Sequence, residues 1–147
     1  MNRFQDKHVI VTGGAGGIGE AICRRFAAEG AHVWIVDSDG ARASSLAEDI
    51  RATAGKARWS TVNLADAAEI FAFVEGMKSE TERIDVLVNN AGINRRRPLL
   101  ELAEDDWYAT FKLNLDALFH MCRAVLPHMI AQGGGAIINT ASQWGLH

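Results

Sequence analysis

Glycines cluster in the stretch Thr12-Gly-Gly-Ala-Gly-Gly-Ile-Gly19. Gly14, Gly16 and Gly19 stand at the spacing G-x-G-x-x-G, directly after a short apolar run and before a helical pattern. Residues without a Cβ let the chain turn sharply and let an anion approach the backbone, and a helix that starts there presents unpaired N–H groups to that anion. The pattern predicts a site for the pyrophosphate of a dinucleotide; a merely tight strand-to-helix turn is the alternative.

An acidic residue, Asp37, ends the apolar run at 32–37, near the expected offset of about twenty residues from the glycine loop. A carboxylate there can accept hydrogen bonds from both ribose hydroxyls of an adenosine and repels a 2′-phosphate. Ser38 and Asp39 follow it, and Arg42 is the nearest base. The sequence therefore favours NAD(H) over NADP(H) as the cofactor, and a role of Asp37 as a helix cap is compatible with this.

Three further motifs follow in chain order: Asn89-Asn90-Ala91-Gly92, Asn114 within an apolar helical stretch, and Ser142 in N-T-A-S-Q-W-G. Together with the loop Thr12-Gly13-x-x-x-Gly17-x-Gly19, they resemble the motifs of the short-chain dehydrogenase/reductase family over the whole chain. The glycine loop also fits T-G-x-x-G-x-x-G of the epimerase-like branch, but N-N-A-G and the context of the serine favour the dehydrogenase/reductase branch.

The resemblance implies an NAD(P)-dependent oxidoreductase that transfers a hydride between nicotinamide and an alcohol or carbonyl of a small molecule. It implies that Ser142 hydrogen-bonds the substrate oxygen and that Asn114 holds a water of a proton relay. From the residues alone, a satisfied structural amide is an equally good interpretation of Asn114. The family usually has Asp at position 63, and the side-chain oxygen of Asn63 can still accept from an adenine amine. The implied cofactor-binding residues are Gly13, Gly14, Gly16, Gly17, Ile18, Gly19, Asp37, Asn63, Leu64, Asn90, Ala91 and Gly92.

In this family a tyrosine of a Y-x-x-x-K motif, on the helix after the serine, is the general acid/base, and the sequence ends before such a helix. Tyr108 and Lys112 have that spacing but precede Asn114, so we interpret them as a chance match on a partly exposed helical face. Residues 1–147 are therefore interpreted as a dinucleotide-binding domain that is incomplete after its fifth strand. A catalytically inactive dinucleotide-binding or assembly module is the alternative if 147 residues is the natural length.

Other polar residues allow two interpretations. Asn89 and Asn90 end a buried strand, where their amides can tie neighbouring strands together, contact a ligand, or do both. The run Arg95-Arg96-Arg97 is a solvated basic turn, or it attracts an anionic substrate or bridges subunits. No metal site is predicted, because no ligand-like spacing relates His8, His32, His120 and His128.

The apolar patterns predict alternating strands and helices, which is typical of a doubly wound parallel sheet of the Rossmann type with helices on both faces. The first helix is expected to have Ile18, Ile22 and Phe26 on its apolar face and to end at Gly30. Asp66 is expected to cap a helix that buries Ile70, Val74 and Met77. Strands are predicted over 7–12, 32–37, 57–64, 84–89 and 136–140, a further helix over 41–54, and two helical pieces over 104–132.

All five strands are expected to be uniformly apolar, and the fifth is expected to form an exposed edge. Pro127 is expected to bend or end the second helical piece of 104–132.

The composition excludes several classes of protein. The 147 residues are 48% hydrophobic and 22% charged, as in one ordinary globular domain, and the net charge of -3 with a pI near 5.9 argues against a nucleic-acid-binding face. No apolar run reaches the length of about eighteen residues that a membrane helix needs. The two cysteines lie in helical patterns and are expected to be buried, reduced thiols. The lack of a signal-peptide pattern and of a membrane helix favours a cytoplasmic location. The resemblance implies a homodimer or homotetramer formed through the helix that contains Asn114.

Overall fold

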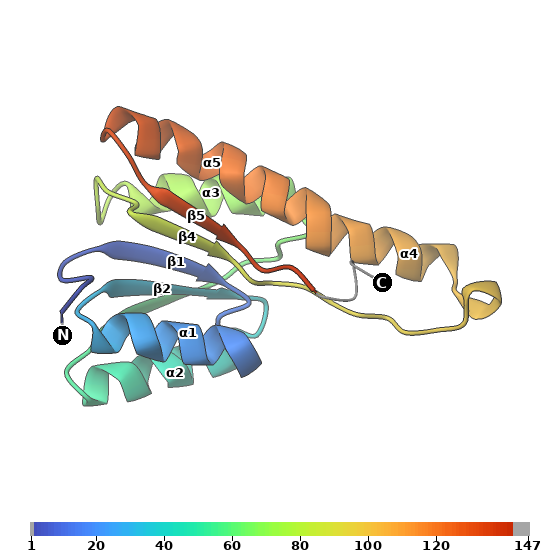
Figure 1. Ribbon diagram of the computed structural model, residues 1–147, viewed down its shortest axis with the longest axis horizontal. Helices are drawn as coiled ribbons and strands as arrows, with labels where there is room; N and C mark the ends of the chain where they lie inside the picture. Colours follow the sequence, from blue (N-terminus) through green and yellow to red (C-terminus); the bar gives the residue numbers. More distant parts are fainter. Residues whose placement is uncertain (1, 143–147) are drawn as a thin grey trace.

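The computed structural model describes residues 2–142 as a five-stranded, wholly parallel sheet with helices on both faces (Figure 1). The strands, in chain order, are β1 (His8–Thr12), β2 (His32–Asp37), β3 (Lys56–Thr61), β4 (Val86–Asn89) and β5 (Ala136–Asn139). They lie in the order β3-β2-β1-β4-β5, so the direction of strand addition reverses at β1. The predicted α/β fold of the Rossmann type is confirmed.

The helices form two layers. Helices α1 (Gly17–Ala28) and α2 (Gly40–Ala52) cover one face of the sheet, and α3 (Ala67–Met77) and α5 (Ala117–Ala131) cover the other (Figure 1). A 3₁₀ turn, η1 (Leu99–Glu101), leads into α4 (Glu104–Phe111), and a π-helical turn, η2 (Lys112–Asp116), joins α4 to α5. The segments α4, η2 and α5 form one continuous helix, and its α4 end projects beyond the carboxyl ends of the strands (Figure 1).

The sheet is buried on both faces at its centre, because successive side chains of a strand point to opposite sides. One set packs against α1 and α2 and comprises Val9, Val11, Val33, Ile35, Val86 and Val88. The other set packs against α3 and α5 and comprises Ile10, Trp34, Val36 and Leu87.

The prediction that all strands are uniformly apolar is wrong for the two edge strands. In β3 the side chains of Lys56 and Arg58 are exposed, and Trp59 is 41% exposed. In β5, which forms the other edge as expected, Ile138 is 48% exposed. Each edge strand has only one neighbour and is incompletely covered by the helices, so its outer positions meet solvent.

The predicted apolar face of α1 is also wrong in part. Ile18 is 67% exposed, whereas Ile22 and Phe26 are only partly buried. The face that packs on the sheet consists of Gly19, Cys23 and Ala27. At Gly19 a side chain would not fit, because a Cβ there would collide with the Gly13 carbonyl.

The long helical segment divides into two pieces at η2, as expected, but the second piece does not finish early at Pro127. Helix α5 continues through Pro127 to Ala131. Proline removes one helical N–H donor, and the burial of Val125 and Met129 against the sheet holds the helix together across that position.

Helix ends follow the local sequence closely. Asp66 caps α3 as predicted, accepting a hydrogen bond from the Ala68 N–H at 2.8 Å. The cap of α2 is Asp39, which accepts from the Arg42 N–H at 3.0 Å, so the suggestion that Asp37 acts as a helix cap is wrong. Within residues 2–142, no helix has the length and apolar character needed to cross a membrane.

Candidate functional site

A cleft of about 720 Å³ opens at the carboxyl ends of the strands, where the sheet order reverses between β1 and its neighbours. Ligands of open α/β sheets bind at this kind of topological switch point. Predicted cofactor residues from four separate segments line it: Gly13, Gly16, Ile18, Asp37, Asn63, Leu64, Asn90, Ala91 and Gly92. Of the other predicted positions, Gly14 and Gly19 are buried behind the loop, and Gly17 is exposed at the start of α1.

The glycine loop leaves almost no room for side chains where it meets the sheet. Gly13 has a φ of 61°, and a Cβ on it would lie 2.8 Å from the Ala91 Cα. A Cβ on Gly14 would lie 2.9 Å from the Val11 carbonyl oxygen. The backbone is thus exposed toward the cleft, followed by the N-terminus of α1, and this is the cradle that a pyrophosphate requires.

Asp37 holds the glycine loop against the end of β2. Its Oδ2 accepts a hydrogen bond from the Ala15 N–H and its Oδ1 from the Asp39 N–H, both at 3.0 Å. Each carboxylate oxygen retains a lone pair, so Asp37 can still accept hydrogen bonds from a ribose within the cleft.

Thr12 is the hydrogen-bonding centre of the site, and sequence reasoning missed this role. Its Oγ1 accepts from the N–H groups of Asn90 at 3.0 Å and Ala91 at 3.1 Å, and lies 3.4 Å from the Val88 carbonyl oxygen. The side chain is 2% exposed. The available signal was a hydroxyl residue at the end of a buried strand, where a polar group needs partners.

The two adjacent asparagines tie strands together, as one of their predicted roles requires. The Asn90 Nδ2 donates to the carbonyl oxygens of Thr12 at 3.3 Å and Gly13 at 3.2 Å. The Asn89 Nδ2 donates to the Asn139 Oδ1 at 2.9 Å, joining β4 to β5. The cross-strand bonds fix the loop that follows β4 relative to the glycine loop.

The π-helical turn places Asn114 against the loop after β4. Its Oδ1 accepts from the Ile93 N–H at 2.8 Å, and its Nδ2 donates to the Ile93 carbonyl oxygen at 2.9 Å. Both ends of the amide are therefore engaged by one residue of the backbone. Asn114 thus fixes the shape of the cleft wall as a satisfied structural amide.

A water-sized cavity of about 20 Å³ lies behind this wall. Asn89, Asn114 and Thr140 are among the residues that line it, and the Oδ1 of Asn89 is buried without a protein partner among the described residues. A volume of this order holds one water, and such a water needs polar partners.

Three cationic side chains line the cleft: Arg42, Arg95 and Lys112. The Arg42 guanidinium lies over Gly16. Arg95 forms an ion pair with Asp106 at 3.1 Å, which links the loop after β4 to α4. Arg95, the first residue of the arginine run, thus has an ion-pair partner within the chain.

Ser142 is exposed and lies three residues after the end of β5 at the carboxyl edge of the sheet. The residues that follow it in S-Q-W-G lie outside the described part of the chain. Tyr108 is 63% exposed and Lys112 is exposed, which agrees with their interpretation as surface residues. Residues 2–142 contain no group of three or more His, Cys, Asp or Glu side chains that could hold a metal ion.

Cys23 is expected to be chemically inert in the folded protein. It packs behind the glycine loop, and burial, with a smaller contribution from Glu20, raises its pKa to about 12. Because the thiolate is the nucleophile, iodoacetamide at about pH 8 should alkylate the half-buried Cys122 first and leave Cys23 largely unmodified. Peptide mass spectrometry of the native and the urea-unfolded protein checks this; equal native rates would contradict it.

Comparison with known proteins agrees with this geometry. Residues 7–147 match the family model described as short chain dehydrogenase. D-threitol dehydrogenase of Mycolicibacterium smegmatis is 42% identical over 141 residues, which is 96% of this chain and 54% of the relative. This chain therefore spans about half the length of that relative.

Two solved structures superimpose closely on the fold. A metagenomic short-chain oxidoreductase in complex with NADP is 34% identical with a TM-score of 0.93, over 98% of this chain and 66% of the other. A 7α-hydroxysteroid dehydrogenase complexed with NADH and 7-oxo glycochenodeoxycholic acid is 30% identical with a TM-score of 0.94, over 99% and 56%.

Proposed function

This chain belongs to the short-chain dehydrogenase/reductase family, and from that premise we propose that it binds a nicotinamide dinucleotide for hydride transfer to or from an alcohol or carbonyl of a small molecule. The observation that carries the proposal is the cleft at the switch point. It brings the glycine loop, Asp37, Asn63 and the N-N-A-G sequence to one place. We assign residues 1–147 to the dinucleotide-binding domain of the enzyme.

Different residues of the cleft would bind different parts of the cofactor. The glycine loop and the N-terminus of α1 would hold the pyrophosphate, and Asp37 would accept the ribose hydroxyls. Asn63, Leu64 and the N-N-A-G sequence would enclose the adenine. The bound nicotinamide would supply the hydride-transferring carbon.

On the reaction side, Ser142 would donate a hydrogen bond to the substrate oxygen. The water-sized cavity beside Asn114 supports a proton relay in which Asn114 positions the wall of the water site. The amide side chain itself is already bonded to Ile93 on both sides. A water in this cavity would lie beside Asn114 without displacing the two hydrogen bonds to Ile93.

The preference for NAD(H) over NADP(H) rests on Asp37. A 2′-phosphate would stand close to this carboxylate and to Asp39, while Arg42 on the same side of the cleft offsets part of the repulsion. The two complexes among the related structures contain one cofactor of each kind, so the preference is proposed from this chain's own residues.

Fluorescence titration with NADH and NADPH tests the cofactor site. NADH should bind at least about tenfold more tightly than NADPH, and Asp37→Ala should remove most of that difference. Arg42→Gln is the matched control, because it alters a charge in the cleft and should weaken NADPH more than NADH. Equal affinities in the unchanged protein would contradict the preference.

A homo-oligomer would form through the helix that contains Asn114. Large apolar side chains recur on its outer face at helical spacing, and each is between 41% and 75% exposed: Tyr108, Phe111, Leu115, Phe119, Leu126 and Ile130. An apolar stripe of this kind is typical of a contact between helices.

A further inference from the structure

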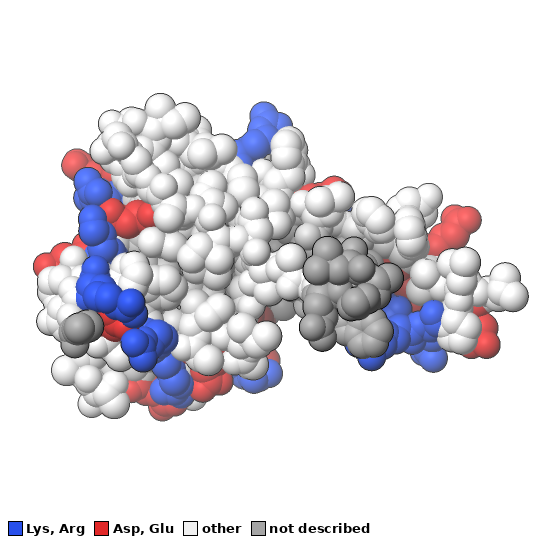
Figure 2. All heavy atoms as spheres, in the orientation of Figure 1, with Lys and Arg blue, Asp and Glu red and all other residues white. Residues whose placement is uncertain are grey.

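A second hollow, of about 470 Å³ and basic in character, lies at the amino ends of the strands, opposite the cofactor cleft. Its charged lining is Arg51, Lys56 and Arg58 with one acid, Glu80. Figure 2 shows basic side chains in a band down the side of the molecule that carries the amino ends of the strands, with acidic side chains between them. The concentration of cations contrasts with the net charge of -3 of the whole chain.

Arg51 is held in place without being neutralised. Its Nε donates to the Ala57 carbonyl oxygen at 2.9 Å, and no carboxylate within residues 2–142 pairs with it. The other two cations of the hollow do have acidic partners, since Lys56 pairs with Asp6 at 2.7 Å and Arg58 pairs with Glu80. The planar guanidinium of Arg51 thus offers its terminal N–H groups to an oxyanion from a fixed position.

Two stacked histidines complete the hollow. His8 and His32 begin β1 and β2, face each other in register, and have ring centroids 4.7 Å apart with planes 19° apart. The Nε2 of His32 lies 3.2 Å from the Nζ of Lys56 and 3.6 Å from the Oδ1 of Asp6. The Nδ1 of His8 is buried with no partner among the described residues.

A proton on His8 is disfavoured by its surroundings. Burial first, and then the neighbouring His32, lower the pKa of His8. The charged groups around the two rings come from every adjoining segment: Asp6, Lys7, Arg51, Lys56, Arg58, Glu80, Arg83 and Asp85. An anion bound among these groups would favour the imidazolium form, so its affinity must rise as the pH falls.

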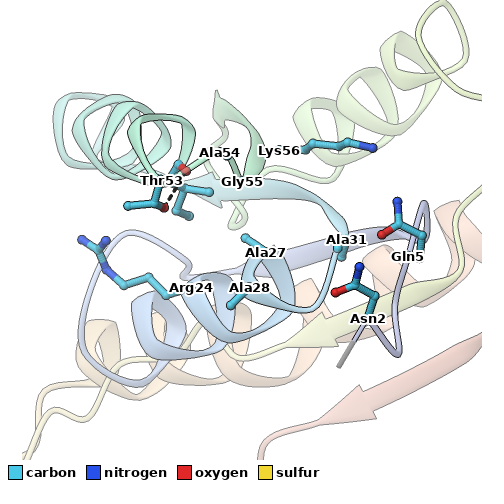
Figure 3. Close-up of a pocket in the computed structure, with 12 residues that line it drawn as sticks. Asn2, Gln5, Arg24, Ala27, Ala28, Ala31, Thr53, Ala54, Gly55 and Lys56 are labelled. Atoms are coloured by element: carbon cyan, nitrogen blue, oxygen red, sulfur yellow. Dashed lines mark hydrogen bonds between the residues drawn. The ribbon is translucent and has the colours of Figure 1, made fainter.

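We propose that this hollow binds a phosphate group, either free phosphate or the monoester of a small metabolite, with Arg51 as the anchor and the stacked histidines as a proton-linked wall. The organic part of a monoester has room next to it. Gly55 and Lys56 also line a larger cavity of about 670 Å³, shown in Figure 3, where the side chains of Asn2, Gln5 and Arg24 surround the ends of α1 and α2.

Sulfate is the probe of choice, because it remains a dianion across the pH range in which histidine titrates. The full chain would be titrated with sulfate at about pH 5.5 and about pH 8, with chloride at matched ionic strength, while the imidazole C–H signals are followed by NMR. His8→Gln and His32→Gln assign the signals. We expect at least about fivefold tighter binding at the lower pH, with the His8 titration midpoint raised by at least about 0.7 pH units in the presence of sulfate.

Arg51→Gln should weaken sulfate binding about tenfold, and Arg51 is exposed at the end of α2, so the fold should tolerate the change. Two controls remove the same charge elsewhere: Arg97→Gln on the exposed loop and Arg42→Gln in the cofactor cleft. Loss of binding in Arg42→Gln but not in Arg51→Gln would assign the anion to the cofactor cleft and overturn the proposal. An equal response to chloride would also overturn it, because it would reduce the effect to screening.

Phosphate and glycerol 3-phosphate then distinguish the two sources of the same group. Tighter binding of glycerol 3-phosphate, reversed by Arg24→Gln, assigns a monoester that extends into the cavity of Figure 3. Equal affinities assign free phosphate. Because the cofactor titrations report on the opposite edge of the sheet, failure here and failure of the proposed function are separate results.

Discussion

Replacing Gly19 with alanine should abolish cofactor binding and lower the free energy of unfolding by at least about 3 kcal/mol. Gly19 is buried, and a Cβ there would collide with the Gly13 carbonyl and stand 2.9 Å from the Nδ2 of Asn90. Both obstacles are fixed, since one is backbone and the other is hydrogen-bonded to Thr12 and Gly13. The glycine loop would have to leave the sheet, and with it the cradle for the pyrophosphate.

Gly17→Ala is the matched control for this prediction. A Cβ at Gly17 meets no atom within 4 Å, and the residue is exposed. Its φ of 53° makes alanine unfavourable by about 1 kcal/mol, which is much less than the collision at Gly19. Urea unfolding and NADH titration of both variants check the contrast. Similar midpoints for the two variants would show that close packing at Gly19 does not determine the loop.

Thr12→Val should be the second most damaging change, with a loss of about 3 kcal/mol in the free energy of unfolding. Valine has nearly the same shape, so packing is preserved, but it leaves the N–H groups of Asn90 and Ala91 without their acceptor. Those donors are at the switch point of the sheet, and the loop that follows β4 would lose its attachment to β1. Cofactor affinity should fall together with stability.

Thr12→Ser separates the hydroxyl from the methyl group. Serine keeps the acceptor, so only the burial of one methyl group is lost, about 1 kcal/mol. Chemical denaturation gives the two stabilities, and hydrogen exchange of the Asn90 and Ala91 amides gives the local effect. If serine proved as destabilising as valine, the hydroxyl would not be the group that holds the site together.

Much of the fold was predictable because its signals are local. The order of strands and helices follows from apolar runs that alternate with helical patterns, and the N-cap at Asp66 and the helix stop at Gly30 follow from the conformations these residues favour. The glycine loop and Asp37 were recognisable for the same reason. Their spacing along one chain is sufficient to predict that they meet at the end of neighbouring strands.

Predictions that depended on tertiary packing were less successful. The exposure of Ile18 depends on where β1 ends under α1, and helical periodicity alone does not contain that information. The continuation of α5 through Pro127 depends on the packing of its buried face, which outweighs one missing hydrogen bond. A proline in the sequence indicates only the lost backbone hydrogen bond and not the packing that compensates for it.

The site shows the same division. The sequence by itself determined which residues would line one cleft, because glycines, a strand-end carboxylate and paired asparagines are identifiable from their spacing. Only the tertiary structure decided that Thr12 bonds the loop after β4, that Asn114 is engaged by Ile93, and that Arg42 lies over Gly16. Each of these contacts joins segments far apart in the chain, and their geometry is set by how the strands pair and how the helices pack on them.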